Sequence, residues 1–290
     1  MFTPAKCPSC SGALQVPTNM QKIKCMYCGV DIIVNSLFSN NDSIDKIKNL
    51  LLLANNATIG KNMEEAYKYY SEVLAIDANC YEAWFGRAIA AAWMSKINHP
   101  RIAESIQDIN TGLKIKPDDY DLNSFAISFH EACVNVFLGF AKYVTSDTTT
   151  ERLQNPNIWI TFAQGALWCC GGIKQAHDIS PNDKDIIENG INVTTSTIML
   201  FKRARNHLVN SNANGNDIGK ANQKMDATNI IVYGHFLIYT TKKQLADPNY
   251  KVQSLEFTPP TAKKNIGCLI ILFITIGVFI SFMIIVQKIA

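Results

Sequence analysis

The spacing of hydrophobic and polar positions changes along the chain, and the first region has the short alternation that is typical of β-structure. Within residues 1–36, apolar side chains alternate with polar ones over three brief stretches. Such a period of two indicates a half-buried strand. We therefore expect a small β domain with strands at Ala13–Val16, Gln21–Lys24 and Asp31–Val34.

Beyond residue 44, apolar residues recur every three or four positions, which is the period of a helix that buries one face. The stretch 36–45 between the two regions is polar, and we expect a link there. Helices are expected within 44–119 and 120–247, the latter including Leu122–Val144, a stripe from Ile158 to His177, a helix after Asp183 and another over Gly219–Leu245. The predicted fold is mainly α, with antiparallel helix pairs that follow the β domain.

The end of the chain differs from both regions, because residues 266–286 include no charged side chain. A helix of this length spans about 31 Å, which matches the ~30 Å hydrocarbon core of a bilayer. We expect a transmembrane helix over 265–287 that contacts membrane lipid, after a proline-containing linker over 248–264. Lys263 and Lys264 flank its entry, and no secretory signal is visible. We therefore expect a single-pass, C-terminally anchored protein with a cytoplasmic N-terminal body.

A sequence repeat lies in the first helical region, where residues 74–79 recur in similar form at 113–118. Apolar, small and aromatic residues take the positions expected for two helix pairs around it: Leu50, Leu53, Ala54, Ala66, Tyr70 and Trp84, then Ser105, Ile109 and Gly112, with Pro117 at the close of the second unit. This pattern resembles the tetratricopeptide repeat (TPR), which implies stacked helix pairs that bind protein segments. It departs from that family in an insertion around residues 95–100 and in Arg87, where leucine is usual.

Four cysteines form two CxxC pairs, Cys7–Cys10 and Cys25–Cys28, separated by fourteen residues. Two such turns that face each other present four thiolates in a tetrahedron. Gly12 and Gly29 are expected to supply the backbone freedom of the turns. The stretch resembles a zinc ribbon, which implies one structural Zn²⁺ ligated by Cys7, Cys10, Cys25 and Cys28 in a site closed to catalytic water. A disulfide interpretation would require an oxidising compartment, which the expected topology argues against.

The composition of the chain excludes only a few broad classes of protein. With 48% hydrophobic residues and a formal net charge of +3, the chain is neither wholly disordered nor a generic nucleic-acid coat. No nucleotide-binding or acyl-transfer motif is present. Cys169, Cys170 and His177 lie close in sequence, but Cys170 and His177 would stand about 10 Å apart along a helix. We interpret them as core residues and predict that the protein is not an enzyme.

These features together favour a membrane-anchored, non-enzymatic adaptor that binds a protein partner through its TPR-like helices, with the ribbon as an accessory docking unit. Candidate partner-binding side chains are Asn62, Lys68, Arg87 and Lys96, and the aromatic candidates for a groove include Tyr67, Tyr69, Phe85 and Trp93, while Tyr70 and Trp84 are assigned to the core. The alternative is a membrane-associated nucleic-acid-binding protein that acts through the ribbon. Its lysines, Lys6, Lys22 and Lys24, are few for a phosphate track.

Overall fold

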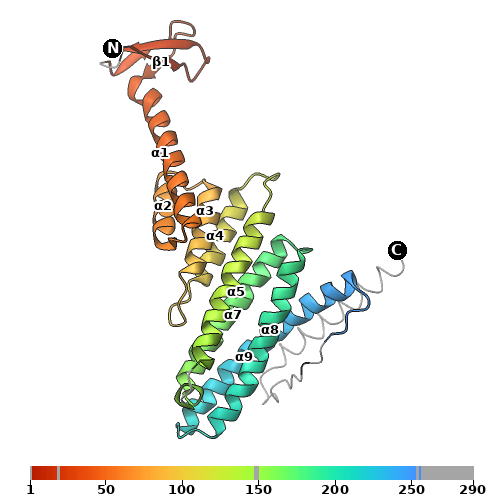
Figure 1. The fold of residues 1–290 in the computed structure, drawn as a ribbon. Coiled ribbons are helices and arrows are strands. Elements are labelled where there is room, and N and C mark those ends of the chain that lie inside the picture. The colour runs from red at the N-terminus through yellow and green to blue at the C-terminus, as the bar shows by residue number, and fades with distance from the viewer. Residues whose placement is uncertain (1, 18–19, 147–149, 253–254, 256–290) are drawn as a thin grey trace, which may run out of the picture. The chain divides into compact units, whose positions relative to one another are not determined.

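The computed structural model describes residues 2–17, 20–146, 150–252 and 255 (Figure 1). The chain divides into two units, residues 1–252 and 253–290, and nearly all described residues belong to the first. The expected transmembrane helix over 265–287 lies outside the described residues, as does most of the expected linker over 248–264. The fold of the first unit is mainly helical, after a small N-terminal region of antiparallel strands, as the hydrophobic pattern predicts.

Two short hairpins form the N-terminal region. In the first, β1 (Phe2–Lys6) pairs antiparallel with β2 (Ala13–Pro17), and in the second β3 (Lys22–Lys24) pairs with β4 (Asp31–Ile33). The three expected strands are confirmed, whereas β1 is an additional strand that the alternation does not predict. The core of this region is small and consists of Leu14, Val16, Ile32 and Val34 packed with the buried cysteines Cys7 and Cys25.

The helical region begins directly after the second hairpin. Helix α1 (Val34–Ile59) starts where β4 ends, so the expected polar link over 36–45 is wrong. The hydrophobic pattern does not predict this part of α1 because polar residues predominate in the stretch, and the polar run at residues 39–43 interrupts the helical spacing of Leu37, Phe38 and Ile44. Farther along α1, Leu50 and Ala54 are buried against α2 as the repeat pattern indicates, but Leu53 is 45% exposed.

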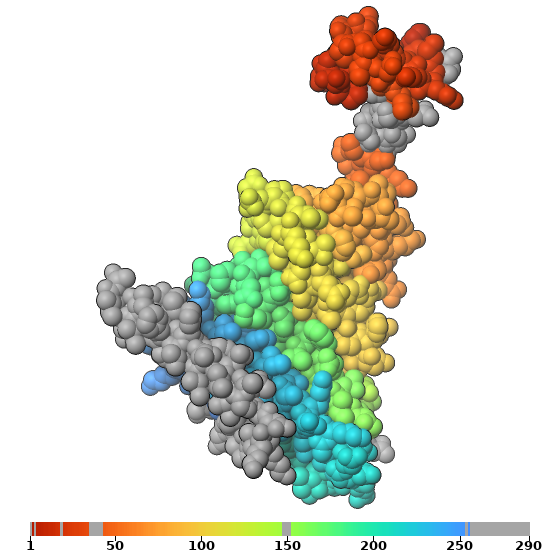
Figure 2. All heavy atoms as spheres, turned by 180° about the vertical axis from the view of Figure 1, so that it is seen from behind, coloured from red at the N-terminus to blue at the C-terminus, as the bar shows by residue number. Residues whose placement is uncertain are grey.

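The remaining helices follow one another as packed pairs (Figures 1 and 2). They are α2 (Met63–Ile76), α3 (Tyr81–Trp93), α4 (Ile102–Ile115), α5 (Asn123–Thr145), α6 (Thr150–Leu153), α7 (Pro156–Ile179), α8 (Lys184–Val209) and α9 (Gly215–Ala246). Helix α1 packs on α2, α3 on α4, α5 on α7, and α8 on α9. Contacts of α2 with α3, α3 with α5, and α7 with both α8 and α9 join the pairs into one array, because no single pair can bury its apolar face alone.

Close packing between helices depends on small residues at the crossing points. The ring of Tyr70 on α2 lies against Gly86 on α3, where a Cβ atom would come within 2.2 Å of the ring. The ring of Phe85 lies in the same way against Gly112 on α4. Ser105 and Ile109 of α4 are fully buried. The small and aromatic positions of the repeat pattern therefore serve helix-to-helix contact, except that Trp84 is only half-buried.

Within the described part of the chain, one helix, α5, is long and apolar enough to cross a membrane, and half of its apolar window is buried inside the fold. Its buried side chains include Phe129, Phe137 and Phe140, and its most extensive packing is on α7. These contacts identify α5 as a core helix of the array.

Candidate metal centre and candidate binding hollow

The four cysteines of the two CxxC pairs meet at one point between the hairpins. Their Sγ atoms all lie within 4.8 Å of one another, and the Cys7–Cys28 and Cys10–Cys25 pairs are each 3.7 Å apart. A tetrahedron with metal–sulfur bonds of about 2.3 Å has edges of about 3.8 Å. Cys7, Cys10, Cys25 and Cys28 are therefore placed to hold a single metal ion, and with four protein ligands the site is closed.

The two turns that carry the cysteines have matching backbone geometry. In the first, the Cys7 amide donates to the Gly12 carbonyl at 2.9 Å, and in the second the Cys25 amide donates to the Val30 carbonyl at the same distance. Each turn also includes one residue in the left-handed region, Ser11 (φ 58°) and Gly29 (φ 71°). Gly29 thus has the expected role, but Gly12 does not, because Ser11 takes the left-handed position in the first turn.

Gly12 instead makes room for an aromatic side chain of the other turn. The ring of Tyr27 lies where a Cβ atom on Gly12 would be 2.5 Å from it. This contact packs the second turn on the first, although Tyr27 is still 64% exposed and its neighbour Met26 is 79% exposed. A side-chain contact therefore joins the two turns beside the four clustered sulfur atoms.

Backbone amides favour the thiolate form at one ligand. The amide of Cys28 lowers the pKa of the Cys25 thiol to about 6, against the opposing effect of burial, and the Tyr27 amide donates to the same sulfur at 3.4 Å. A thiolate is the form that ligates a metal.

Among the lysines expected to matter for the nucleic-acid alternative, Lys22 is paired with Asp31 at 3.1 Å, which reduces the positive charge of this surface.

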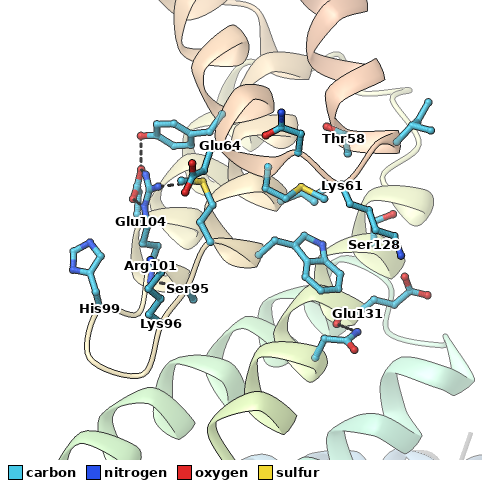
Figure 3. Close-up of a pocket in the computed structure, with 18 residues that line it drawn as sticks. Thr58, Lys61, Glu64, Ser95, Lys96, His99, Arg101, Glu104, Ser128 and Glu131 are labelled. Atoms are coloured by element: carbon cyan, nitrogen blue, oxygen red, sulfur yellow. Dashed lines mark hydrogen bonds and ion pairs between the residues drawn. The ribbon is translucent and has the colours of Figure 1, made fainter. Parts of the chain in front are cut away.

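A second candidate site is a hollow of about 1270 Å³ among the helix ends of the array (Figure 3). It lies between the α1–α2 turn, the end of α3, the α3–α4 loop and the first half of α5. Figure 3 shows Lys61, Ser128 and Glu131 at one end, while Lys96 and His99 lie at the other. The lining therefore combines charges of both signs with large apolar side chains, among which Trp93 is 38% exposed.

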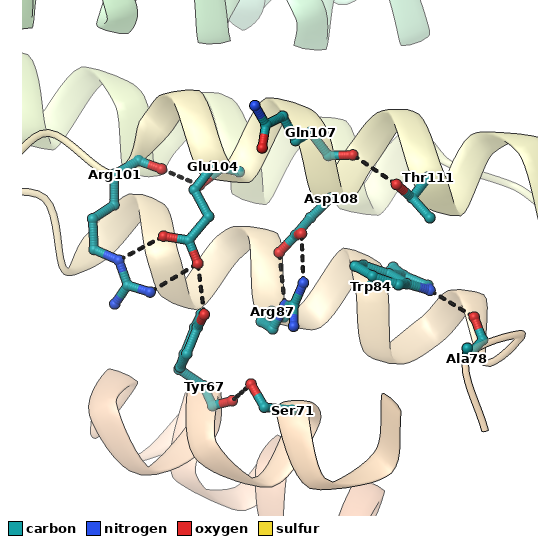
Figure 4. Close-up of polar contacts among 11 residues, drawn as sticks. Tyr67, Ser71, Ala78, Trp84, Arg87, Arg101, Glu104, Gln107, Asp108 and Thr111 are labelled. Carbon is teal, nitrogen blue, oxygen red and sulfur yellow. Dashed lines mark hydrogen bonds and ion pairs between the residues drawn. The ribbon is translucent and has the colours of Figure 1, made fainter. Parts of the chain in front are cut away.

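One wall of this hollow is fixed by a polar network (Figure 4). The Arg101 guanidinium donates to the Glu104 carboxylate at 2.8 and 2.9 Å, and the Tyr67 hydroxyl donates to the same carboxylate at 2.6 Å. Burial would raise the pKa of Glu104, but the hydrogen bonds from Arg101 and Tyr67 hold it below its ordinary value. Because Tyr67 lies on α2 and Glu104 on α4, the network links two helix pairs.

The four predicted partner-binding residues take different positions. Asn62 and Lys96 line the hollow. Asn62 also caps α2, accepting a hydrogen bond from the Glu65 amide. Lys68 is exposed and paired with Glu72 at 4.0 Å, outside the hollow. Arg87 is turned toward α4, where it donates two hydrogen bonds to Asp108.

Residues that the sequence prediction does not include complete the hollow. Lys61, His99 and Glu131 line it, together with the aromatic candidates Tyr67 and Trp93. The one signal for His99 is the insertion around residues 95–100, which interrupts the repeat immediately after Trp93. Glu131 cannot be identified in this way, because α5 reaches the hollow through packing between helices that are distant in sequence.

The cysteines of α7 are core residues. Cys169 and Cys170 are buried, and burial raises the pKa of Cys170 to about 12 and that of Cys169 well above its ordinary value. A nucleophilic cysteine requires the opposite shift. The ring of His177 packs edge-on against Tyr239, with 5.3 Å between the ring centroids. This geometry agrees with the interpretation of these residues as core packing.

No protein-family model matches this chain, and a search of curated proteins finds no match either. The fold and the site themselves define the protein as an array of antiparallel helix pairs, preceded by a small β region whose four cysteines could hold a metal ion.

Proposed function

We propose that this chain is a membrane-anchored, non-enzymatic adaptor that binds a protein partner through its TPR-like helical array. The observation that carries the proposal is the hollow of about 1270 Å³, which is open among the helix ends and lined by both charged and apolar side chains. Sites that bind other proteins commonly combine apolar and polar side chains. Partly exposed aromatic residues such as Trp93 supply most of the binding energy, and the polar groups fix the orientation of the partner.

The metal of the four-cysteine site in this proposal is one structural Zn²⁺. Thiolate ligands in a tetrahedral arrangement favour zinc among the common divalent ions, and a closed site stabilises the fold without chemistry. The small core of the two hairpins supports this role, since such a unit depends on its metal for stability. Exposed Met26 and Tyr27 then make the ribbon an accessory docking unit.

Anchoring by residues 266–286 is the third part of the proposal. Its support is the uncharged sequence itself, whose length fits a bilayer. An anchor at this position would hold the ribbon and the array on the cytoplasmic side. By binding its partner, the adaptor would then raise the local concentration of that partner at the membrane surface.

The proposal is tested by affinity purification of the full-length protein from membranes in mild detergent, with and without nuclease. We expect a stoichiometric protein partner that survives nuclease and is lost in the Trp93→Ala variant. A matched control is Lys220→Ala, which changes an exposed lysine on α9, outside the hollow. Recovery of the protein in the soluble fraction, or of no protein partner, would contradict the proposal. Nucleic acid that is lost at high salt and on neutralising Lys22 and Lys24 would favour the alternative instead.

A further inference from the structure

Two smaller hollows continue the large one along α5. One of about 390 Å³ shares Trp93, Ser95 and Asn135 with the large hollow. The next, of about 330 Å³, shares Ile97 and Tyr143 with the second. Since each shares lining residues with its neighbour, the three form one groove that runs from the α1–α2 turn to the start of α7.

The floor of this groove is one exposed stripe of α5. Its residues are Ser128, Glu131, Asn135, Gly139 and Tyr143, which are spaced by three or four positions and are all exposed. From the first to the last the stripe is about 22 Å long at 1.5 Å per residue. An extended peptide rises about 3.3 Å per residue, so the groove accommodates about seven residues of an extended chain.

The facing wall is the loop between α3 and α4, which includes the insertion that breaks the repeat. Ser95 lines the first two hollows, Ile97 the second and third, and Asn98 the third. An isolated bridge between Lys96 and His99, with hydrogen bonds of 3.2 and 2.9 Å, closes the loop into a turn. The insertion therefore gives the groove a side that a repeat of regular length would lack.

Charge is unevenly distributed along the groove. The first hollow has charged side chains of both signs, whereas among the described residues no charged side chain lines the second and third. The Arg152 guanidinium lies over the Tyr143 ring, 4.6 Å from its centroid, and donates to the Tyr143 carbonyl, so it is the charge nearest to this section among the contacts described. Away from Tyr143, a charged ligand residue would lose water without gaining a partner, which is costly. Uncharged amides of Asn98, Asn135 and Asn157 are present there, and such groups can both donate to and accept from a peptide backbone.

We propose that this groove binds an extended segment of the partner protein whose residues over the α5–α7 section are uncharged, with aromatic or aliphatic side chains against Tyr143 and Ile97. This inference rests on the proposed function and specifies its site and ligand chemistry. Charged residues of the same segment lie in the first hollow, where an acidic residue can pair with Lys61 and a basic residue with Glu131.

Gly139 gives a sharp test because it lies in the groove floor and, in the part of the chain that the structure describes, no atom other than those of its chain neighbours and its own helix backbone lies within 4 Å of where its Cβ would be. A leucine side chain at this exposed position starts in open space and points into the groove, and it improves helix propensity by up to about 1 kcal/mol, so the variant should fold. The matched control is Gly219→Leu, which changes another exposed, uncrowded helical glycine, on α9 and outside the groove.

The probe is a phage-displayed library of random linear peptides, selected on the full-length protein in mild detergent. We expect enriched peptides with a run of about four uncharged residues that includes aromatic or aliphatic side chains. Gly139→Leu should weaken the binding of an enriched peptide at least tenfold, or about 1.4 kcal/mol, by fluorescence anisotropy, whereas Gly219→Leu should leave it unchanged.

Several results would overturn the groove assignment: no enrichment, enrichment of charged runs, or equal binding by the two leucine variants. A dimer of the chain that becomes a monomer in Gly139→Leu would instead identify a second copy as the occupant and would also overturn it. The proposed function fails separately. A partner that copurifies equally with the unchanged protein and with Gly139→Leu would support the adaptor function but contradict the groove as its binding site. Peptide binding in the groove without any copurifying partner would support the groove but contradict the adaptor function.

Discussion

Arg87 on α3 and Asp108 on α4 form a bidentate pair, with hydrogen bonds of 2.8 and 2.7 Å. The Asp108 side chain is 5% exposed and that of Arg87 is 18% exposed. Burial raises the pKa of Asp108, and the two hydrogen bonds from Arg87 oppose that shift. Arg87 also lies over the indole of Trp84, 4.6 Å from its centroid. The arginine that departs from the repeat pattern is therefore a structural link between paired helices.

Replacing Arg87 with leucine, the residue usual at this position of a tetratricopeptide repeat, should destabilise this protein by about 3–5 kcal/mol, because Asp108 is then left buried without its cation. The double variant Arg87→Leu/Asp108→Leu should recover most of the loss, since both charges are gone. Urea unfolding followed by circular dichroism measures the difference. Lys68→Ala is the control, because it removes an exposed pair worth less than about 1 kcal/mol. Equal effects of Arg87→Leu and Lys68→Ala would contradict the assignment.

The contact of Tyr70 with Gly86 gives a second prediction. Gly86→Ala places a methyl group 2.2 Å from the Tyr70 ring, which is buried and fixed by a 2.8 Å hydrogen bond from its hydroxyl to Asn55. Overpacking of this kind costs about 1–3 kcal/mol of the unfolding free energy. Gly219→Ala, at an uncrowded helical position, should instead stabilise by up to about 1 kcal/mol. If both alanine variants were stabilising, the two helices would not approach as closely as described.

Part of this fold can be predicted from the sequence because its determinants are local. The metal site follows from two CxxC spacings, and helix positions follow from the period of apolar residues, as in α5. Small residues at positions such as Gly112 indicate helix contacts through their place in the repeat alone. In each case the signal lies within one element or within a short spacing.

The rest depends on contacts between distant residues or on elements without a pattern. Strand β1 is not predicted because Pro4 interrupts its alternation, although its pairing with β2 is regular. In the N-terminal part of α1, polar residues predominate and interrupt the helical spacing. The groove requires the stripe on α5 to face the loop at residues 95–100, and no local spacing shows that these two elements meet. The pairing of Arg87 with Asp108 is likewise a contact between helices.

Two histidines, His177 buried on α7 and His235 half-buried on α9, predict a loss of stability in acid. Within the described part of the chain, His177 and His235 have buried ring nitrogens without hydrogen-bond partners. Burial, with a smaller effect from Lys174, lowers the pKa of His177 and lowers that of His235 to about 4. The unfolded chain binds a proton near pH 6.5, whereas the folded protein does so only at lower pH, so stability falls as the pH drops below about 6.5 toward 4.

We expect His235 alone to account for a loss of roughly 2 kcal/mol in unfolding free energy between pH 7 and pH 5. His235→Phe should reduce this pH dependence, since the phenyl ring cannot take up a proton. The measurement is urea unfolding at both pH values, with His99→Phe as the control because His99 is exposed in the α3–α4 loop. A protein that is equally stable at pH 5 and pH 7 would refute the assignment of neutral imidazoles to His177 and His235.

Cys25 offers the most direct test of the metal centre. Cys25→Ser removes a ligand from the closed site, so the ion should be lost and residues 2–33 should unfold, because the core formed by Leu14, Val16 and Ile32 is too small to persist alone. The helices should remain, since among the described elements only the start of α1 makes substantial contact with a strand, β4, and the other helices pack on one another. Metal analysis and hydrogen exchange measure the two effects, with Cys80→Ser, a buried cysteine outside the site, as the control. Loss of helical circular dichroism across the whole chain would contradict this separation, as would retention of one equivalent of metal in the variant.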